Sequence, residues 1–228
     1  MGPSNDKFLY KNVGYLTFLA GTVNTCAIVF LELSITHFTG NISNAAIALA
    51  NGEFTIFSQT LSCVMTFFLG SIISGYINYE RKSNLTKYDS ILPILFGITM
   101  HITVNITTNS IILLSVISFG MGIQNGTYIK LKGILVRTTH MTGHITDAGF
   151  CLGSLLHGNR DDAWKFMFYM RSISLFFLGG FTSFLLIRVI NTKAIEVIAL
   201  LYCIFGLHIG YHYLKEKQNI ISVNAEIE

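Results

Sequence analysis

The stretches "THFTGNISNA" (residues 36–45) and "THMTGHITDA" (residues 139–148) are two copies of one polar segment, with Thr, His, Thr, Gly, Ile and Ala shared in register. The rest of the chain is apolar, since 51% of its 228 residues are hydrophobic and 12% are charged. A soluble domain averages about 25% charged residues, and a soluble protein of this size could not bury so much apolar surface. The composition therefore predicts an integral membrane protein that carries the same polar segment twice.

Six segments are long and apolar enough to cross a membrane as helices, which takes about 20 residues each. They are residues 8–31, 54–79, 89–108, 110–130, 162–189 and 194–214. Two further pieces, residues 40–51 and 143–157, begin at the repeated motif. Twelve helical residues rise about 18 Å, little more than half of a hydrocarbon core near 30 Å. We therefore expect an all-α protein with six transmembrane helices and two re-entrant half-helices.

Lysine and arginine residues predict the orientation, because cytoplasmic loops carry the excess of positive charge. The assignment that fits best gives six crossings with both termini in the cytoplasm, and Arg188 and Lys193 are its exceptions. The net charge of the chain, +3, therefore serves orientation rather than nucleic-acid binding. The residues on the predicted cytoplasmic side are Lys7, Lys11, Arg81, Lys82, Lys87, Lys130, Lys132, Arg137, Arg160, Lys165, Lys215 and Lys217.

Further matches between the two halves extend the repeat beyond the polar segment. "GTVN" (21–24) matches "GIQN" (122–125), "FFLG" recurs at 67–70 and 176–179, and "MHI" (100–102) matches "LHI" (207–209). Each half has three spans, an odd number, so the second half starts from the opposite side of the membrane. We predict one transmembrane domain over residues 1–228, built as a 3+3 inverted repeat of residues 8–108 and 110–214 with a polar tail at 215–228.

These elements together resemble the YoaK-type bacterial membrane proteins of unknown function. The similarity covers residues 14–212 and is carried by "GTVN", "FTGN", "FFLG", "GIQN" and "MTGH". The resemblance implies a six-span protein of the bacterial inner membrane and supplies no substrate. Asn24 stands where the family often has Asp, and His144 stands where it more often has a small or hydroxyl residue. Because position 24 is Asn, the resemblance does not imply a carboxylate there that could couple transport to a proton or a cation.

The candidate site lies where the two motifs begin their half-helices. Thr39 and Thr142 are expected to cap the helices, and Gly40 and Gly143 to let the two backbones approach closely at the membrane midplane. A helix N-terminus carries about half an elementary positive charge. Two of them would suit a carboxylate, another anion or a polar oxygen. The alternative is that the small residues only let the half-helices pack tightly.

Imidazole and amide side chains complete the predicted site. His37 and His140 occupy equivalent positions and suit substrate binding, proton transfer or, with His144 and Asp147, metal binding. Amides in apolar spans need partners, so they bind substrate or join helices. The predicted substrate-binding residues are Asn24, Thr36, His37, Thr39, Gly40, Asn41, Asn44, Gln124, Asn125, Thr139, His140, Thr142, Gly143, His144 and Asp147.

An acid and a base appear in the second half where the first half is neutral. Asp147 replaces Asn44, and Arg171 corresponds to Ser62. A charge deep in the membrane costs less when it is paired, so we expect a structural ion pair between Asp147 and Arg171. The alternative is that Arg171 extends to the cytoplasmic surface.

The leading functional hypothesis is a secondary transporter of small solutes, because inverted repeats with broken elements are typical of such proteins. A channel-like pore is the alternative. A metal-dependent intramembrane hydrolase that uses His and Asp ranks last, because no nucleophile or glutamate base stands in a recognisable context. We therefore expect no enzymatic activity, cofactor or resident metal. The expected partners are membrane lipid and a small-molecule or ion substrate, with no nucleic acid, and a homo-oligomer is an allowed assembly.

Overall fold

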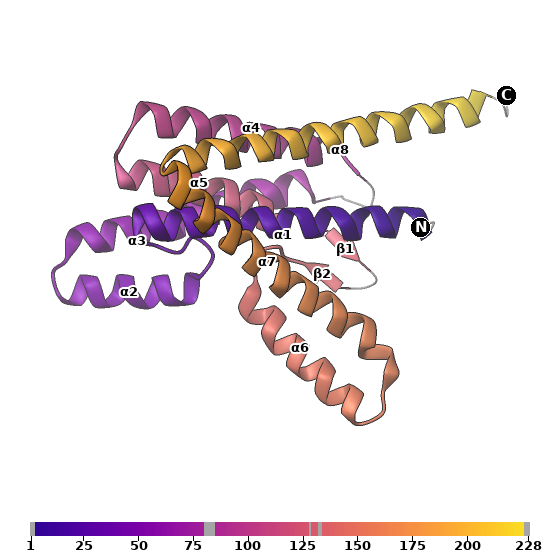
Figure 1. Cartoon of the computed structure of the whole chain (residues 1–228), viewed down its shortest axis with the longest axis horizontal. Helices are drawn as coiled ribbons and strands as arrows, with labels where there is room; N and C mark the ends of the chain where they lie inside the picture. Colours follow the sequence, from indigo (N-terminus) through magenta and orange to yellow (C-terminus); the bar gives the residue numbers. More distant parts are fainter. Residues whose placement is uncertain (1–2, 80–84, 128, 132–133, 226–228) are drawn as a thin grey trace.

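The computed structural model describes residues 3–79, 85–127, 129–131 and 134–225, and these are almost entirely α-helical (Figure 1). The elements are α1 (Pro3–Leu31), α2 (Phe38–Ala50), α3 (Phe54–Ile77), α4 (Lys87–Ile106), α5 (Ser110–Gly126), β1 (Ile129–Leu131), β2 (Ile134–Val136), α6 (Met141–Leu156), the 3-10 helix η1 (Arg160–Asp162), α7 (Ala163–Ile190) and α8 (Lys193–Ala225). The predicted all-α class is confirmed. Arg81, Lys82 and Lys132, which contribute to the predicted orientation, lie outside the described residues.

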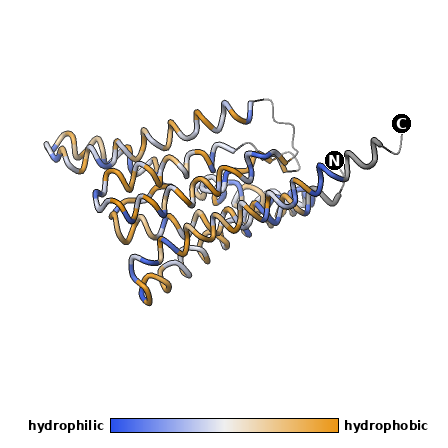
Figure 2. The backbone as a smooth tube through the Cα atoms, turned by 90° about the horizontal axis from the view of Figure 1, so that it is seen from above, coloured by the Kyte–Doolittle hydropathy of each residue, from blue (hydrophilic) through white to orange (hydrophobic). Residues whose placement is uncertain are grey.

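Five helices of the described part are long and apolar enough to cross a membrane, within α1, α3, α4, η1–α7 and α8. α5 is also apolar but has 17 residues, a length of about 25 Å. Large apolar side chains point away from the protein, among them Val189, of which 81% is exposed. Figure 2 shows hydrophobic residues along the length of the helices. A surface this apolar needs lipid around it, so the chain is an integral membrane protein.

A short antiparallel hairpin stands between α5 and α6. β1 pairs with β2, with Ile129 opposite Val136 and Leu131 opposite Ile134. The sequence predicted a helical span over residues 110–130, but α5 ends at Gly126. Ile129 and Lys130, which the sequence placed in that span, belong instead to β1 of the hairpin.

Both short helices end in a tight turn that starts the next long helix. Gly52 follows α2 with φ 74°, and Gly158 follows α6 with φ 93°. Glycine is the residue that adopts this left-handed conformation without steric cost. The turns lay α2 against α3 and α6 against α7. In Figure 1, α2 runs leftward from the middle of the bundle, away from the termini, whereas α6 runs the other way, to the right and downward.

Glycine residues bring α1 against α7 and α3 against α5 at two equivalent crossings. A Cβ atom added to any of four glycines would overlap a backbone carbonyl oxygen of the facing helix. The facing pairs are Gly21 with Phe176, Gly179 with Phe18, Gly70 with Phe119 and Gly122 with Phe67. Close contact of this kind between small residues is typical of helix packing in membranes. α4 packs against α8 as a third pair, and Ser90 Oγ donates to the Gly206 carbonyl at 2.8 Å.

Candidate functional site

The short helices of the two motifs begin earlier than the sequence indicated. α2 starts at Phe38 and α6 at Met141, with His37 and His140 in the N-cap positions. Thr39 and Thr142 therefore lie within the first turn, and the prediction that they cap the helices is wrong. Neither N-cap residue accepts a side-chain hydrogen bond from the first turn. Both helices therefore keep first-turn N–H groups without a side-chain cap.

Each motif glycine makes room for the histidine that precedes it by one turn. A Cβ atom on Gly40 would overlap the His37 ring, and one on Gly143 would lie 2.5 Å from Cε1 of His140. The sequence predicted that these glycines would let the two motif backbones approach each other, but the neighbour of each is an imidazole ring of its own motif. α2 and α6 pack on α3 and α7 instead.

The two equivalent asparagines hold the segments that lead into the motifs. Asn24 Oδ1 accepts from the Ile35 N–H at 3.1 Å and from Ser34 Oγ at 2.9 Å. Asn125 Oδ1 accepts from the Thr139 N–H at 3.3 Å. Because both amides are used by the protein itself, the structure favours their joining role over substrate binding. Asn41 is likewise held, since Nδ2 donates to the Ser34 carbonyl at 2.7 Å. Thr36 is half-buried, and its N–H donates to Ser34 Oγ at 3.4 Å.

Gln124 links three parts of the chain. Its Nε2 donates to the Leu16 carbonyl at 3.1 Å and to Thr138 Oγ1 at 2.9 Å. Its Oε1 accepts from the Tyr202 hydroxyl at 2.8 Å. One side chain of α5 therefore ties α1, the segment before α6, and α8 together.

The remaining predicted residues divide into exposed and buried groups. His37, Thr39, Asn44, His140, Thr142 and Asp147 are exposed. His144 is buried, with its ring centre 5.4 Å from that of Tyr169 and 6.1 Å from that of Phe168. Its Nδ1 atom is buried without a hydrogen-bond partner. In the part of the chain that the structure describes, no three His, Cys, Asp or Glu side chains are grouped as metal ligands.

The predicted ion pair between Asp147 and Arg171 is not formed, because no contact within 4.0 Å joins these two described residues. Arg171 Nη1 donates to the Tyr10 carbonyl at 2.9 Å, and its guanidinium carbon lies 4.0 Å from the Tyr10 ring centre, a cation–π geometry. Gly14 makes room for this guanidinium. Arg171 lies on the face of α7 that packs on α1, whereas Asp147 lies on the exposed side of α6. The partner of Arg171 is therefore α1.

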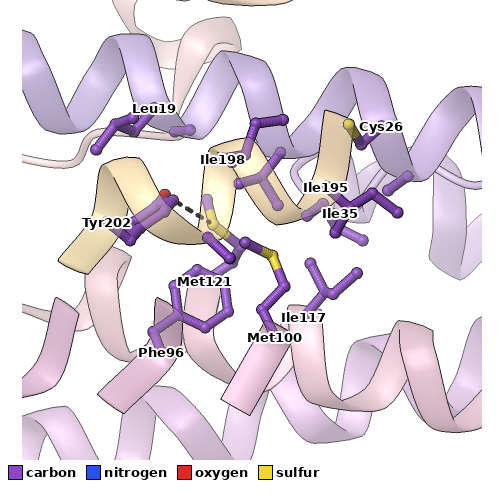
Figure 3. Close-up of a cluster of buried hydrophobic side chains, with 14 of the residues drawn as sticks. Leu19, Cys26, Ile35, Phe96, Met100, Ile117, Met121, Ile195, Ile198 and Tyr202 are labelled. Carbon is purple, nitrogen blue, oxygen red and sulfur yellow. Dashed lines mark hydrogen bonds between the residues drawn. The ribbon is translucent and has the colours of Figure 1, made fainter. Parts of the chain in front are cut away.

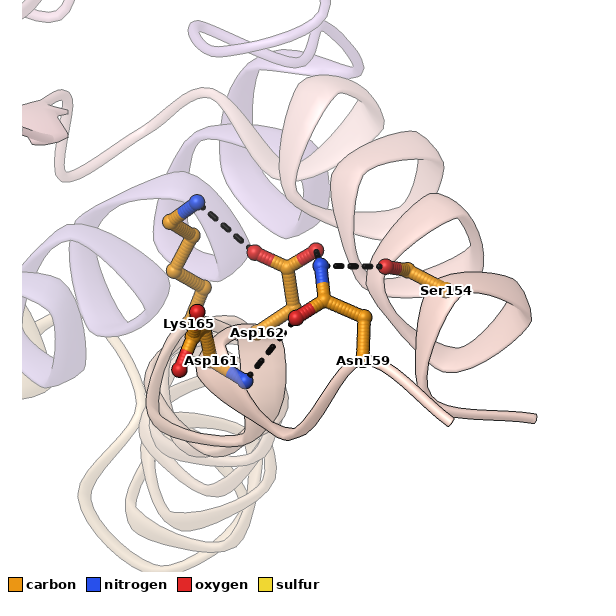
Figure 4. Close-up of polar contacts among 5 residues, drawn as sticks. All are labelled: Ser154, Asn159, Asp161, Asp162 and Lys165. Carbon is orange, nitrogen blue, oxygen red and sulfur yellow. Dashed lines mark hydrogen bonds and ion pairs between the residues drawn. The ribbon is translucent and has the colours of Figure 1, made fainter. Parts of the chain in front are cut away.

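A different ion pair joins the start of α7 to the turn before it. Lys165 Nζ lies 2.7 Å from Asp162 Oδ1. Asn159 supports this turn, since its Oδ1 accepts from the Asp161 N–H and its Nδ2 donates to Ser154 (Figure 4). This pair bears on the connection between α6 and α7 and not on the motif.

Two cavities enter the bundle between the same four helices, α1, α4, α5 and α8. The large cavity has a volume of about 610 Å³ and is lined by Leu9 and Tyr88, near the starts of α1 and α4. The small cavity has a volume of about 390 Å³ and is lined by Leu31 and Asn105, near the ends of the same helices. The cavities therefore lie toward opposite ends of the bundle, the large one toward the end where α1 begins and α8 ends (Figure 1).

A packed layer of buried side chains from α4, α5 and α8 lies where the two cavities meet (Figure 3), and it consists of Met100, Ile117, Met121, Ile198 and Tyr202. Met100 and Ile117 line the small cavity, and Tyr202 lines the large one. The two cavities overlap along the bundle, since the large one also reaches Thr103 on α4 and Ser115 on α5. They nevertheless share no lining residue.

Of the predicted site residues, Gln124 lines the large cavity, and none of the others lines either of these two cavities. Sequence reasoning missed Asn12, which lines the large cavity although only 6% of it is exposed. The signal was present, because Leu9, Asn12, Val13 and Leu16 form one stripe at helical spacing in which Asn12 alone is polar.

Comparison with known proteins identifies a family and no activity. Residues 13–208 match a family model described as a protein of unknown function, DUF1275. No curated protein and no solved structure matches the chain.

Proposed function

Because the chain belongs to the DUF1275 family of membrane proteins, which is defined by no activity, we propose from its geometry that it is a secondary transporter of small solutes. One observation carries the proposal. Two cavities enter from opposite ends of the bundle and share no lining residue, and a packed layer of buried side chains lies where they meet. A solute carrier needs this arrangement, because its site must be reached from one side at a time.

We further propose that the fold is a 3+3 inverted repeat with α5 as the sixth span. The glycine crossings support this, because Gly21 and Gly122 are 101 residues apart, as are Phe18 and Phe119. Gly70 and Gly179 are 109 residues apart, as are Phe67 and Phe176. Exchanging the halves therefore turns the α1–α7 crossing into the α5–α3 crossing, atom for atom. Asn24 and Asn125 also bind equivalent segments, since each accepts from a backbone N–H just before or at the start of its motif, in registers that differ by one residue.

In this proposal α2 and α6 are re-entrant. Their 13 and 16 residues amount to about 20 and 24 Å, less than the hydrocarbon core of about 30 Å. The Phe38 ring at the start of α2 lies 4.1 Å from the Phe67 ring in the middle of α3. α2 therefore begins at half the depth of its neighbour and ends at the turn where α3 starts, which is the path of a half-helix.

The uncapped N-termini of α2 and α6 are the proposed place for a polar oxygen or an anionic group of the solute. Neither has a side-chain cap, and a helix N-terminus attracts negative charge. The two ends lie apart from the cavities in this structure. We propose that they contribute in a different state of the transport cycle from the one the structure represents.

A channel-like pore is the second candidate, because both cavities lie between the same helices, α1, α4, α5 and α8. The packed layer argues for a carrier, since buried side chains rather than a continuous opening lie between the cavities. The two candidates predict different kinetics. A carrier saturates and exchanges solute across the membrane, whereas a pore conducts in proportion to concentration.

Proteoliposomes made with the purified protein test the proposal. Uptake from a mixture of small metabolites is measured by mass spectrometry against protein-free liposomes. We expect at least one solute whose uptake saturates and is accelerated when the vesicles are preloaded with the same solute. Non-saturating flux would favour the pore. Flux equal to the protein-free baseline for every solute, with folded protein in the vesicles, would count against both.

A matched pair of variants links the flux to the packed layer. A Cβ atom on Gly120 would overlap the Phe96 ring, which packs on Tyr202 of the layer, whereas one on Gly149 of α6 meets nothing within 4 Å. We expect Gly120→Ala to change the rate of uptake severalfold and Gly149→Ala to leave it unchanged. Equal rates in the two variants would contradict a gating role for the layer.

A further inference from the structure

The large cavity contains one polar side chain that the protein leaves entirely without partners. Asn12 is 6% exposed and lines the cavity. Neither its Oδ1 nor its Nδ2 atom has a hydrogen-bond partner. Burying an amide without partners costs free energy, and such groups in folded proteins call for an explanation.

Other asparagines of this chain show how the amide could have been satisfied. Asn78 Nδ2 donates to the Ser74 carbonyl at 2.8 Å, and Asn105 Nδ2 donates to the His101 carbonyl at 2.9 Å. Both bonds reach the carbonyl four residues back in the same helix. Asn12 has the same option in α1 and does not use it. No hydrogen bond therefore holds its side chain in the present rotamer, and it can turn toward a molecule in the cavity.

Most of the other polar side chains of the cavity wall already make hydrogen bonds within the protein. Gln124 makes the three hydrogen bonds described above. The lining hydroxyl groups donate to carbonyls of their own helices, Thr66 to Ser62, Thr99 to Phe96, Thr103 to Thr99, Ser115 to Ile111 and Thr127 to Ile123. Among the polar side chains named here, Asn12 is the one whose donor and acceptor are both without a partner, and a turn of its side chain would bring them to a ligand.

The chemistry of the wall also indicates the charge of that ligand. Most of the lining is apolar, including Leu9, Val13 and Leu16 beside Asn12 on α1. A charged group in such a cavity needs an opposite charge, and the acidic side chain on the wall is Asp89, which already accepts from the Thr86 N–H at 2.8 Å. The surroundings favour a neutral ligand.

We propose that the large cavity binds an apolar, uncharged small molecule through a carboxamide or lactam edge that pairs with Asn12. Such an edge presents a donor and an acceptor side by side, the complement of the asparagine amide. This inference rests on the proposed transport function, since it names the class of solute. Binding is nevertheless measurable without transport.

The test uses three rigid probes and the full-length protein in detergent. The probes are biphenyl-4-carboxamide, its N,N-dimethyl derivative, which lacks the donors, and biphenyl, which lacks both groups. Binding is measured by titration calorimetry. We expect the wild type to bind the primary amide at least about tenfold more tightly than either analogue, because each analogue leaves part of the Asn12 amide unpaired.

Two variants separate binding from structure. In Asn12→Leu the preference for the primary amide should fall to within about twofold, and the melting temperature should not fall, because an unpaired buried amide has been removed. In Asn78→Leu, which alters a buried asparagine outside both cavities, the preference should persist and the melting temperature should fall.

The proposal is overturned if the wild type does not discriminate between the probes or binds none of them, or if Asn12→Leu retains the preference. A fall in melting temperature in Asn12→Leu equal to that in Asn78→Leu would assign Asn12 a structural role instead. Discrimination without flux in proteoliposomes would refute the transport proposal and leave this site intact.

Discussion

At the scale of single residues, the histidine of each motif packs its ring against the glycine three residues later. His37 and His140 fold their rings over the first turn of α2 and α6, over the position where a Cβ would otherwise stand. The glycines are therefore explained by a side chain three residues earlier rather than by the opposite half-helix. An imidazole ring can change rotamer to make room for a new methyl group, whereas a backbone carbonyl moves only with its helix. We therefore expect alanine to cost less stability at the motif glycines than at the glycines of the helix crossings.

We predict that Gly143→Ala destabilises the protein because the new methyl group forces the His140 ring into another rotamer. Relative to Gly149→Ala, which gains the helix preference of alanine without a clash, the cost should be about 0.5–1.5 kcal/mol, as for a displaced side chain. Thermal unfolding in detergent measures it, with Gly149→Ala in the same helix as the control, since that position has open space around it. On a His140→Ala background the cost should vanish, because the ring is gone. If the cost persisted without the ring, a different neighbour would have to be responsible.

The predicted site residues show what sequence reasoning could reach at this scale and what it could not. The motif, its two copies and the importance of Asn24, Gln124 and Asn125 followed from local sequence, because polar residues in apolar spans are few. Whether an amide is satisfied depends on residues far away in the chain, such as Tyr202 for Gln124. For the same reason Asn12 passed unnoticed, and Arg171 was assigned to Asp147 rather than to Tyr10.

The glycine crossings determine how close the long helices lie at the scale of secondary-structure elements. At Gly70 the neighbour is the Phe119 carbonyl of α5, and a backbone atom can move only if the helix moves. The same holds at the α1–α7 crossing. These contacts belong to the pairs α1–α7 and α3–α5, each of which joins one half of the chain to the other.

We predict that Gly70→Ala lowers the free energy of unfolding by about 1–3 kcal/mol, the usual cost of overpacking. Gly75→Ala, in the same helix, should raise it by up to about 1 kcal/mol, because alanine favours the helix and nothing lies within 4 Å of the added Cβ. Unfolding of both variants in mixed detergent micelles gives the comparison. Similar changes of one sign in the two variants would show that the crossing is looser than described.

The eight helices were predictable as elements, because a long run of apolar residues allows no other structure in a membrane. The sequence also distinguished the short α2 and α6 from the long helices, since each begins at a motif. Two features were missed for physical reasons. The β1–β2 hairpin depends on pairing between neighbouring strands. α5 ends at Gly126 because the backbone of the next residue, Thr127, has φ −59° and ψ 118°, outside the helical range.

The orientation of the whole molecule depends on whether α5 crosses the membrane. α1 begins and α8 ends at the same end of the bundle (Figure 1). With α5 as a span there are six crossings, and both termini lie on one side. Without it, the five candidate helices would put the termini on opposite sides. The side of the membrane on which the C-terminus lies therefore shows whether six or five helices cross.

We predict that both termini are cytoplasmic. Lys7, Lys11, Lys215 and Lys217 lie at that end, where positive charge is retained, and α5 covers about 25 Å of a core near 30 Å, a small mismatch that a thinned bilayer accommodates. Alkaline phosphatase, active only outside the cytoplasm, is fused after residue 108 and after residue 228, with a fusion after residue 80 as the cytoplasmic control. We expect activity at 108 alone, and fluorescence from a green fluorescent protein fused at 228. Phosphatase activity at 228 would mean that an odd number of helices crosses, which would remove α5 from the spans and with it the inverted repeat.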